Sequence, residues 1–335
     1  MNKTNHRKWR TKLRRILFAV AVCTFLSGCG SSGQNLQLPG VEPIPRDEYE
    51  RYLNSKQKNS KDMEESSVQD TLQNTEEELE KQLSSIIQSE GDVLETRILP
   101  PDGYERTDVE EGSLAEFLHN YPMKPDGSRV HLYDGSDKGN QTVHAAVFDL
   151  PLENYDLQQC ADSVIRIYAE YYWAREEYDK IRFHFTNGFM AEYTKWRDGS
   201  RITVNGNHAT WVPSKERDTS YECFVRYLRT IFCYAGTLSM EQESHPTTID
   251  RLKAGDVFLH GGTPGHVVMV VDVCKDAAGK KAFLLAQGYM PAQEFHLLKN
   301  ERHPEDPWYY EEEIVFPLST PEYTFEEGSI RSLDY

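Results

Sequence analysis

The stretch that most constrains the fold is "GDVFLHGGTPGHVVMVVDV", which covers residues 255–273. Apolar runs stand on either side of Gly and Pro residues, and apolar runs divided by turn residues predict neighbouring β-strands. Further strands are expected downstream, whereas the segments upstream carry helical patterns. Because helices come first and strands joined by short turns follow, the chain predicts an α+β domain with a mostly antiparallel sheet. The expected strands are 256–260, 266–274, 282–288 and 294–299.

The helical signals come from the spacing of apolar residues. Residues 156–178 place apolar side chains on one face, and Asp156 is the expected N-cap of that helix. Residues 219–236 repeat the 3.6-residue period, and Gly236 is expected to close the second helix. A shorter helix is expected over 113–119. These helices would cover a face of the predicted sheet.

The N-terminus carries a targeting pattern. Residues 1–15 contain seven Lys or Arg and no Asp or Glu, and the apolar run "ILFAVAVCTFL" and then "LSGC" follow, ending at Cys29. This pattern resembles a bacterial lipoprotein signal peptide at 1–28, which implies cleavage before Cys29 and attachment of lipid, palmitate included, to its thiol. The alternative is an uncleaved membrane helix, but the run is short for a span of roughly 20 residues. We therefore expect export and a lipid anchor on the outer face of the cell membrane.

A polar segment separates the anchor from the folded part. Residues 29–91 are poor in apolar side chains and are expected to form a flexible, acidic tether. Within it, 74–91 has a thin apolar stripe, which favours a solvated stalk helix over a coiled-coil partner site. Residues 92–335 are expected to form a single globular domain. The sequence does not decide whether residues 92–150 form a separate lobe of it.

Net charge excludes some partners. The chain carries a formal charge of −17, and loss of the seven positive charges of the signal peptide would leave about −24. Nucleic acid is therefore excluded, because binding to phosphates needs a basic face. The same charge argues against adsorption on an anionic membrane, so the lipid must hold the protein there.

The cysteines do not form a recognisable framework. They are scattered and show no CxxC or His/Cys spacing, which argues against disulfides and against a structural metal site. No cofactor motif is found either. The cysteines that remain after Cys29 are Cys160, Cys223, Cys233 and Cys274.

A histidine opens the longest predicted strand. The pattern "GDVFLH…PGH" around His266 resembles the histidine strand of papain-like folds, in particular the NlpC-type cell-wall cysteine peptidases. That resemblance implies that His266 is the general base for a cysteine on a preceding helix. A histidine and a helix N-terminus together stabilise a thiolate. A structural histidine at a turn is the alternative.

Two cysteines are candidates for the nucleophile. Cys160 lies in the first turns of the first long helix, and the order Gln, Cys, then His about a hundred residues on is that of papain. Gln158 or Gln159 would add an oxyanion donor. Cys223 lies in the first turn of the second helix and points away from its apolar stripe, but the Asp-Cys-Ser-Gly signature of NlpC-type enzymes is absent. Either cysteine could also be a structural thiol.

Further candidates lie downstream of His266. Gln287 is expected on the neighbouring strand, where it would orient the imidazole, and His296 is a lower-ranked candidate for the base. Aromatic and amide side chains nearby suit a sugar or peptide groove, although they are also ordinary packing residues. They are Tyr289, Gln293 and Trp308.

The chain as a whole resembles the uncharacterised bacterial family catalogued as domain of unknown function 4846, over roughly 98–326. The resemblance implies a secreted or lipid-anchored bacterial protein, and Cys160 and His266 belong to the motifs it shares. The motifs are "LQQCAD", "AEYYW", "FTNG", "YTKWRDGSR", "SYECFVRYL", "YAGTLSM", "GDVFLHGGTPGH", "LLAQGYMPAQEFHLLKN", "PWY" and "TPEYTF".

These observations predict a papain-like α+β domain that acts on amide bonds such as those of cell-wall peptide, with Cys160 as nucleophile, His266 as base and Gln287 as orienting residue. The substrate class rests on analogy of fold. The alternative is a non-catalytic envelope module that binds glycan or peptide in the same cleft.

Overall fold

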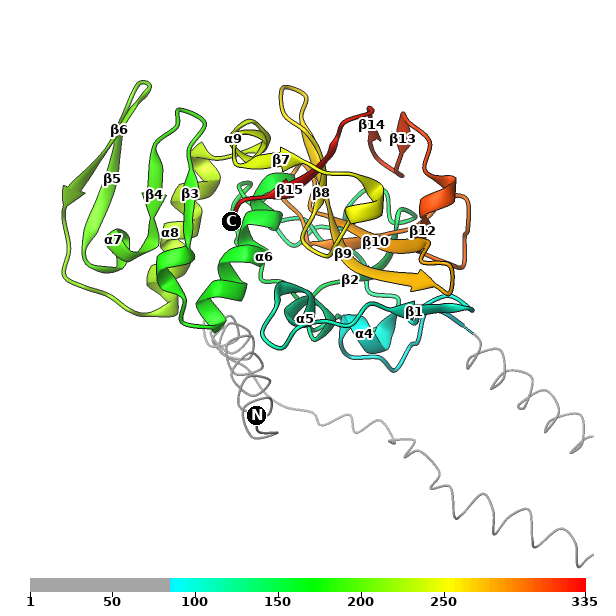
Figure 1. Ribbon diagram of the computed structural model, residues 1–335. Coiled ribbons are helices and arrows are strands. Elements are labelled where there is room, and N and C mark those ends of the chain that lie inside the picture. Colours follow the sequence, from blue (N-terminus) through cyan, green and yellow to red (C-terminus); the bar gives the residue numbers. More distant parts are fainter. Residues whose placement is uncertain (1–84) are drawn as a thin grey trace, which may run out of the picture. The chain divides into compact units, whose positions relative to one another are not determined.

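The structure is a computed structural model that describes residues 85–335 (Figure 1). The predicted signal peptide, Cys29 and most of the predicted stalk helix lie outside the described residues. Residues 86–335 belong to one compact unit. No helix of the described part is long and apolar enough to cross a membrane.

A large antiparallel sheet organises this unit, in the strand order β2–β11–β10–β9–β8–β15–β7. The long strand β9 pairs with β8 along its first half and with β1 along its end, while β10 also pairs with β12. The strands are β1 (Tyr104–Arg106), β2 (His144–Val147), β7 (Ser244–Pro246), β8 (Val257–His260), β9 (His266–Asp276), β10 (Lys281–Gln287), β11 (His296–Leu298), β12 (Tyr309–Tyr310) and β15 (Ile330–Leu333). The predicted α+β class with an antiparallel sheet is confirmed.

Residues 267–271 of β9 are all apolar because both faces of the sheet are covered there. Its side chains alternate across the sheet with a period of two. Val267, Met269 and Val271 enter the larger core, whereas Val268 and Val270 enter the smaller one on the opposite face. An uninterrupted apolar run therefore marks a central strand that has no solvated face.

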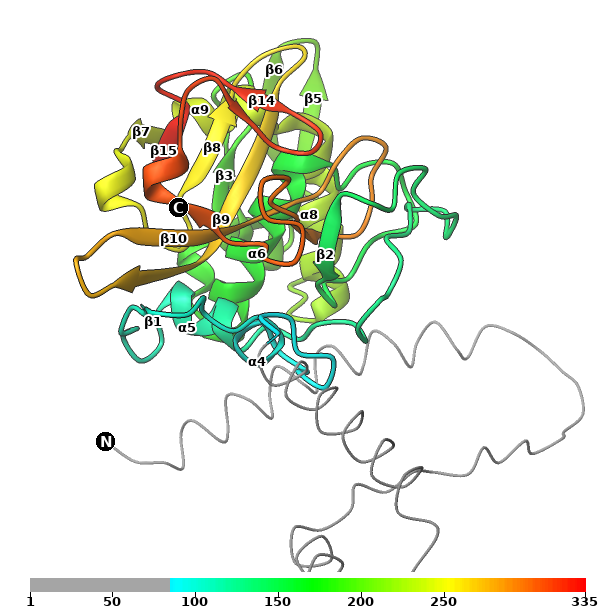
Figure 2. The same ribbon diagram turned by 90° about the vertical axis from the view of Figure 1, so that its right-hand side faces the viewer.

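Helices and small hairpins surround the sheet. Helix α6 (Cys160–Ala174) packs on β9 and β10 and separates them from α8 (Tyr221–Tyr234), as Figure 1 shows. Figure 2 shows β5 and β6 together at one end of the molecule. The other elements are α4 (Leu94–Arg97), α5 (Leu114–His119), α7 (Tyr193–Arg197), α9 (Thr237–Gln242), β3 (Arg182–His184), β4 (Met190–Glu192), β5 (Ser200–Asn205), β6 (His208–Pro213), β13 (Leu318–Ser319), β14 (Thr324–Phe325) and short 3-10 turns at 178–180, 249–251 and 311–313.

The segment 85–150 is built into the same unit. Strand β1 pairs with the end of β9, and β2 pairs with β11. The described end of the predicted stalk helix is not helical, because Ile87 forms a bridge with Ile98 and packs on the core. Folded structure thus begins before residue 92, and the first part of the domain does not form a separate lobe.

The second predicted helix ends one residue earlier than expected. Ala235 is the C-cap of α8, with its N–H bonded to the carbonyl of Ile231. Gly236 instead precedes α9 as its N-cap and accepts from Ser239 Oγ through its carbonyl. The chain therefore turns directly from one helix into the next, and the glycine starts the second helix instead of closing the first.

Candidate active site

Cys160 is the first residue of α6. The helix begins three residues later than expected: Gln159 is the N-cap in place of Asp156, and its N–H donates to Asp162 Oδ2 at 3.1 Å. Asp156 does not cap the helix, because its Oδ1 accepts from the backbone N–H of Ala292 at 2.7 Å. The first N–H groups of a helix have no partner within it, so they are available near the Cys160 thiol.

The start of α6 lies beside the start of β9 and the end of β10. The backbone N–H groups of Ala161 and Val267 act on the Cys160 thiol, and Val267 directly follows His266. Gly288, which directly follows Gln287, approaches so closely that a Cβ atom there would lie 2.2 Å from Ser163 Oγ and 2.8 Å from the Gln159 carbonyl oxygen. The structure therefore brings Cys160 to the sheet edge that carries His266 and Gln287.

His266 and Gln287 form a direct hydrogen bond. His266 Nε2 lies 2.7 Å from Gln287 Oε1, and both residues are almost completely buried. His266 opens β9 and Gln287 closes β10, which are neighbouring antiparallel strands. The end of one strand thus meets the beginning of the other, as expected from the order of the strands.

Partners of Gln287 decide which nitrogen of His266 carries the proton. Lys138 Nζ donates to both carboxylate oxygens of Glu322, at 2.7 and 2.9 Å, and Gln287 Nε2 donates to Oε2 at 2.7 Å. A carboxylate held in an ion pair only accepts, so the amide nitrogen of Gln287 must face Glu322 and its oxygen must face His266. His266 Nε2 is then the donor, and Nδ1 of a neutral ring keeps its lone pair.

His296 takes the second proton of the same amide. Its Nδ1 donates to the carbonyl of Glu294 at 2.8 Å, and its Nε2 lies 3.4 Å from Gln287 Nε2. The ring is completely buried, and burial lowers the pKa of His296 to about 3. His296 therefore supports Gln287 as a neutral acceptor and is not placed to act as the base.

Aromatic rings enclose His266. Tyr289 and Tyr323 each lie with their ring centroid 5.0 Å from the imidazole, and Phe325 lies at 6.0 Å. Tyr323 and Phe325 belong to the β13–β14 hairpin region, and the hydroxyl of Tyr289 donates to the carbonyl of Glu322 at 3.3 Å. Of the predicted groove residues, Tyr289 is thus the one that lies beside His266.

Burial keeps both reactive groups neutral. Burial, followed by the charge of Asp162, raises the pKa of the Cys160 thiol to about 11, against the opposing effect of nearby backbone N–H groups. Burial also lowers the pKa of His266 to about 4, although the hydrogen bond that His266 donates to Gln287 opposes that shift. Within residues 85–335 no hydrogen bond joins the Cys160 thiol to the His266 ring. The resting site therefore holds a thiol and an imidazole, not a thiolate and an imidazolium.

The two glutamines before Cys160 differ in role. Gln158 is buried and serves the core: its Oε1 accepts from Arg166 Nη1 at 3.1 Å, and its Nε2 donates to the carbonyl of Pro151 at 3.1 Å. Gln159 is partly exposed and its side-chain amide donates to Asp156 Oδ1 at 3.1 Å. Of the two, only Gln159 has a side-chain amide that is not engaged in the core.

Cys223 lies elsewhere. It is completely buried in the first turn of α8, near Trp196, Arg201 and Arg226, and burial raises the pKa of its thiol. The helical stripe did not indicate this burial, because α7 covers a face of α8 that the sequence pattern left open. The structure does not bring Cys223 to His266.

Two predicted groove residues are instead part of the core. Trp308 has no exposed surface, and its Nε1 donates to the carbonyl of Leu99 at 2.8 Å. Gln293 is 1% exposed and pairs with Leu132 in an isolated bridge. Neither side chain has surface to offer a ligand, which corrects the expectation for both.

Glu322 and Lys138 belong to the site but were not predicted from the sequence. Glu322 belongs to the quoted motif "TPEYTF", but nothing in its spacing points to Gln287, 35 residues away. Lys138 pairs with it across 184 residues. In the described part of the chain, no group of His, Cys, Asp and Glu is arranged to hold a metal ion.

The comparisons with known proteins give a family and no activity. A family model described as domain of unknown function (4846) matches residues 94–332. No curated protein matches the chain, and no solved structure matches it.

Proposed function

This chain belongs to the family of domain of unknown function 4846, whose description states no activity, and from its site we propose that it is a cysteine hydrolase that cleaves or transfers amide bonds. Cys160 is the nucleophile, His266 the general base and Gln287 the residue that orients the base. The observation that carries the proposal is the 2.7 Å hydrogen bond from His266 Nε2 to Gln287 Oε1. It leaves Nδ1 as the nitrogen that can accept a proton.

The proposed reaction has two halves. The Cys160 thiol transfers its proton to His266 Nδ1 while its sulfur attacks the amide carbonyl, and the developing oxyanion is stabilised by N–H groups at the start of α6. The amine leaves with the proton from Nδ1, and a thioester on Cys160 remains. Water, or an acceptor amine, then gives up a proton to His266 as it attacks the thioester and frees the thiol.

The arrangement supports a papain-like architecture. A cysteine at the start of a helix, a histidine on the first residue of a sheet strand and an amide side chain on the neighbouring strand follow one another along the chain in papain order. Helix α6 packs directly on the strands β9 and β10 that carry the other two residues. We infer a papain-like catalytic core from this order and packing.

The proposed substrate is cell-wall peptide. We propose that the protein is exported and held by lipid on Cys29 at the outer face of the membrane, because residues 1–29 carry a lipoprotein-type signal. The acidic charge of the remaining chain makes nucleic acid an unsuitable substrate. Labelling cells with a palmitate analogue tests the anchor: Cys29→Ser should abolish the label, and a labelled Cys29→Ser protein would contradict it.

A non-catalytic role in binding glycan or peptide is the second candidate. His266 is 2% exposed, and Tyr289, Tyr323 and Phe325 enclose its ring. A site that is closed and neutral at rest suits the recognition of a ligand by aromatic side chains as well as it suits catalysis.

Incubation of the full-length protein with cell-wall peptides distinguishes the two candidates. Catalysis predicts release of new amino groups, with loss of at least about a hundredfold in rate in Cys160→Ala and in His266→Ala. Cys233→Ser is the matched control, because Cys233 is an exposed thiol on α8. Peptide binding without release of amines would refute catalysis and support the binding module.

A further inference from the structure

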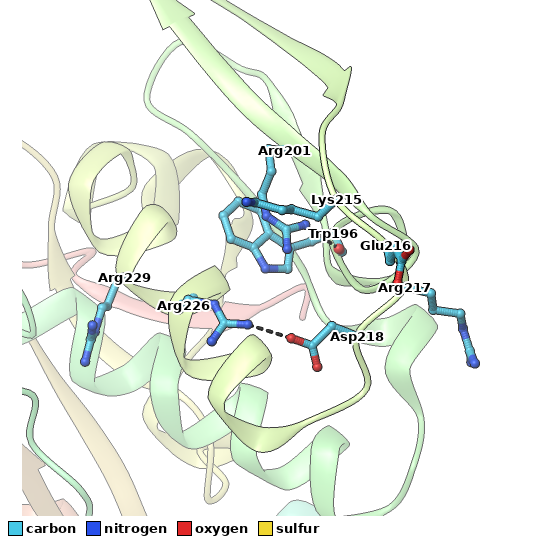
Figure 3. A pocket seen from close by; sticks show the side chains of 8 residues that line it. All are labelled: Trp196, Arg201, Lys215, Glu216, Arg217, Asp218, Arg226 and Arg229. Carbon is cyan, nitrogen blue, oxygen red and sulfur yellow. Dashed lines mark hydrogen bonds and ion pairs between the residues drawn. The ribbon is translucent and has the colours of Figure 1, made fainter.

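A basic groove lies on the opposite side of α8 from the α6 helix, between α7, the β5–β6 hairpin and the loop before α8. We call it the Trp196 groove; Trp196, Arg201, Lys215, Asp218 and Arg226 line its centre, and its volume is about 820 Å³. Figure 3 shows the Trp196 ring between Arg201 and Lys215 on one side and Arg226 on the other. From this arrangement we propose that the Trp196 groove binds phosphate groups of an anionic polymer.

The charge of the groove is opposite to that of the whole chain. Its lining includes five Lys or Arg side chains and two Asp or Glu side chains, a formal charge of +3. Two further carboxylates pair with lining cations, Asp198 with Arg217 and Glu153 with Arg229, so the groove with its immediate partners carries +1, whereas the chain carries −17. Charges beyond a Debye length of roughly 10 Å are largely screened, so a ligand in the groove experiences this local excess. A concave surface with one sign of charge concentrates the field on a counter-ion.

The cations are held in place and are not all neutralised. Arg201 Nη1 donates to the carbonyls of Trp196 and Ser200 at 2.7 and 2.6 Å, and its guanidinium lies 4.3 Å from the centroid of the Trp196 ring. Arg226 pairs with Asp218 at 2.6 Å, and both side chains remain at least 36% exposed. Lys215 is exposed, and within residues 85–335 its ammonium forms no ion pair.

Gly199 fixes the loop that presents Lys215. The backbone N–H of Lys215 donates to the carbonyl of Gly199 at 3.0 Å. Gly199 has a φ of +105°, and a Cβ atom on it would lie 2.2 Å from the Lys215 carbonyl oxygen. This close approach of two backbones fixes the main chain of Lys215 beside the groove before a ligand arrives.

The arrangement suits phosphate better than carboxylate. Two guanidinium groups and an ammonium approach the groove from different sides, which matches the several oxygens of a tetrahedral phosphate. The Arg201 guanidinium lies over the face of the Trp196 ring. That face is therefore not available to stack on a nucleic-acid base. The groove is also hollow, and a flat membrane surface cannot enter it, whereas a slender polymer can.

Inorganic polyphosphate is the probe for the full-length protein, with binding measured by calorimetry at 50 and 200 mM NaCl. Three phosphate contacts predict a slope of log K against log salt of about −2, or about fifteenfold weaker binding at the higher salt. Lys215→Glu should weaken binding at least about tenfold. Lys275→Glu, an exposed lysine at the end of β9 with the same change in charge, should weaken it less than about twofold.

Four outcomes would overturn the proposal: no saturable binding at 50 mM NaCl, equal loss in Lys275→Glu and Lys215→Glu, equal affinity for polyglutamate, or binding only to vesicles that contain phosphatidylglycerol. Thermal unfolding of each variant shows that it is folded, and Arg226→Gln provides a second test with a smaller change. The result does not depend on Cys160, so amide hydrolysis and binding to the groove can fail separately.

Discussion

Replacing His266 by Phe should change how the stability of the protein depends on pH. The ring packs among Tyr289, Tyr323 and Phe325, which a phenyl ring can also do. The variant loses the hydrogen bond to Gln287 and leaves its buried Oε1 without a donor. At pH 7 that loss should lower the free energy of unfolding by about 1–3 kcal/mol.

Acid should reverse this difference. Burial lowers the pKa of His266 from 6.5 to about 4 in the folded protein, so the unfolded chain binds a proton first as the pH falls. Above pH 6.5 the imidazole is neutral in both the folded and the unfolded protein, so its titration does not change the free energy of unfolding. Between pH 6.5 and pH 4 only the unfolded chain binds the proton, and the wild type loses stability. At pH 4 this loss amounts to about 3 kcal/mol, and the Phe variant does not incur it.

The measurement is urea denaturation of the full-length protein and the variant at pH 7, 6, 5 and 4. The difference between them should be largest at pH 7 and close to zero or reversed at pH 4. Groups remote from His266 titrate alike in both proteins and cancel in the difference. His208→Phe, at an exposed position on β6, is the control and should give a curve parallel to the wild type. Parallel curves for His266→Phe would refute the burial of a neutral imidazole.

Further predictions concern the contacts around the site. Gly288→Ala places a Cβ atom 2.2 Å from Ser163 Oγ, so it should lower stability by about 1–3 kcal/mol in urea denaturation; an unchanged midpoint would contradict the close packing of α6. Lys138→Met leaves the Glu322 carboxylate without its cation and should destabilise by about 3–5 kcal/mol, whereas a loss below about 1 kcal/mol would place the pair in solvent. Alkylation of Cys160 by iodoacetamide, mapped by mass, should still rise between pH 8 and pH 10, because the pKa of its thiol is raised to about 11; a plateau near pH 8.5 would contradict that shift.

The parts of the fold and of the candidate site that could be predicted from the sequence are those set by residues close together in the chain. The apolar run of β9 predicts a central strand, and the neighbouring position of Gln287 follows from the short turn between β9 and β10. The start of α6 was misplaced because Asp156, a good N-cap residue, is engaged by the N–H of Ala292 across 136 residues. That competition is a tertiary contact, and the sequence around Asp156 carries no sign of it.

The same limit applies to side chains whose role comes from distant segments. Cys223 stands off the apolar stripe of α8, yet it is buried, because the segment with Trp196 covers it. Trp308 lies in a motif that suits a groove, yet its indole reaches the carbonyl of Leu99, 209 residues away. Local periodicity identifies which face of a helix meets the main core, but it cannot identify a second partner supplied by another part of the chain.

A buried neutral pair is compatible with catalysis if the thiolate need exist only briefly. Proton transfer from a thiol of pKa about 11 to an imidazole of pKa about 4 is unfavourable by about 10 kcal/mol. If substrate binding brings Cys160 Sγ and His266 Nδ1 to about 4 Å, attraction between the new charges returns about 4 kcal/mol. The remaining 6 kcal/mol or so fits within a barrier of about 16 kcal/mol for turnover near 10 per second.

A neutral thiol and a neutral imidazole at rest predict the shape of the pH–rate profile for amide cleavage. Activity requires a neutral imidazole and a neutral thiol, so kcat/KM for amide cleavage should fall below about pH 4 and above about pH 11, where His266 protonates and Cys160 ionises. Between those limits it should stay level. Gln287→Ala should lower the plateau, because the imidazole is then free to adopt the other tautomer, and should leave the alkaline limit in place. A fall in rate centred near pH 8.5 would mean that the thiol is solvated in the working enzyme, and the closed site would then be a state that substrate must open.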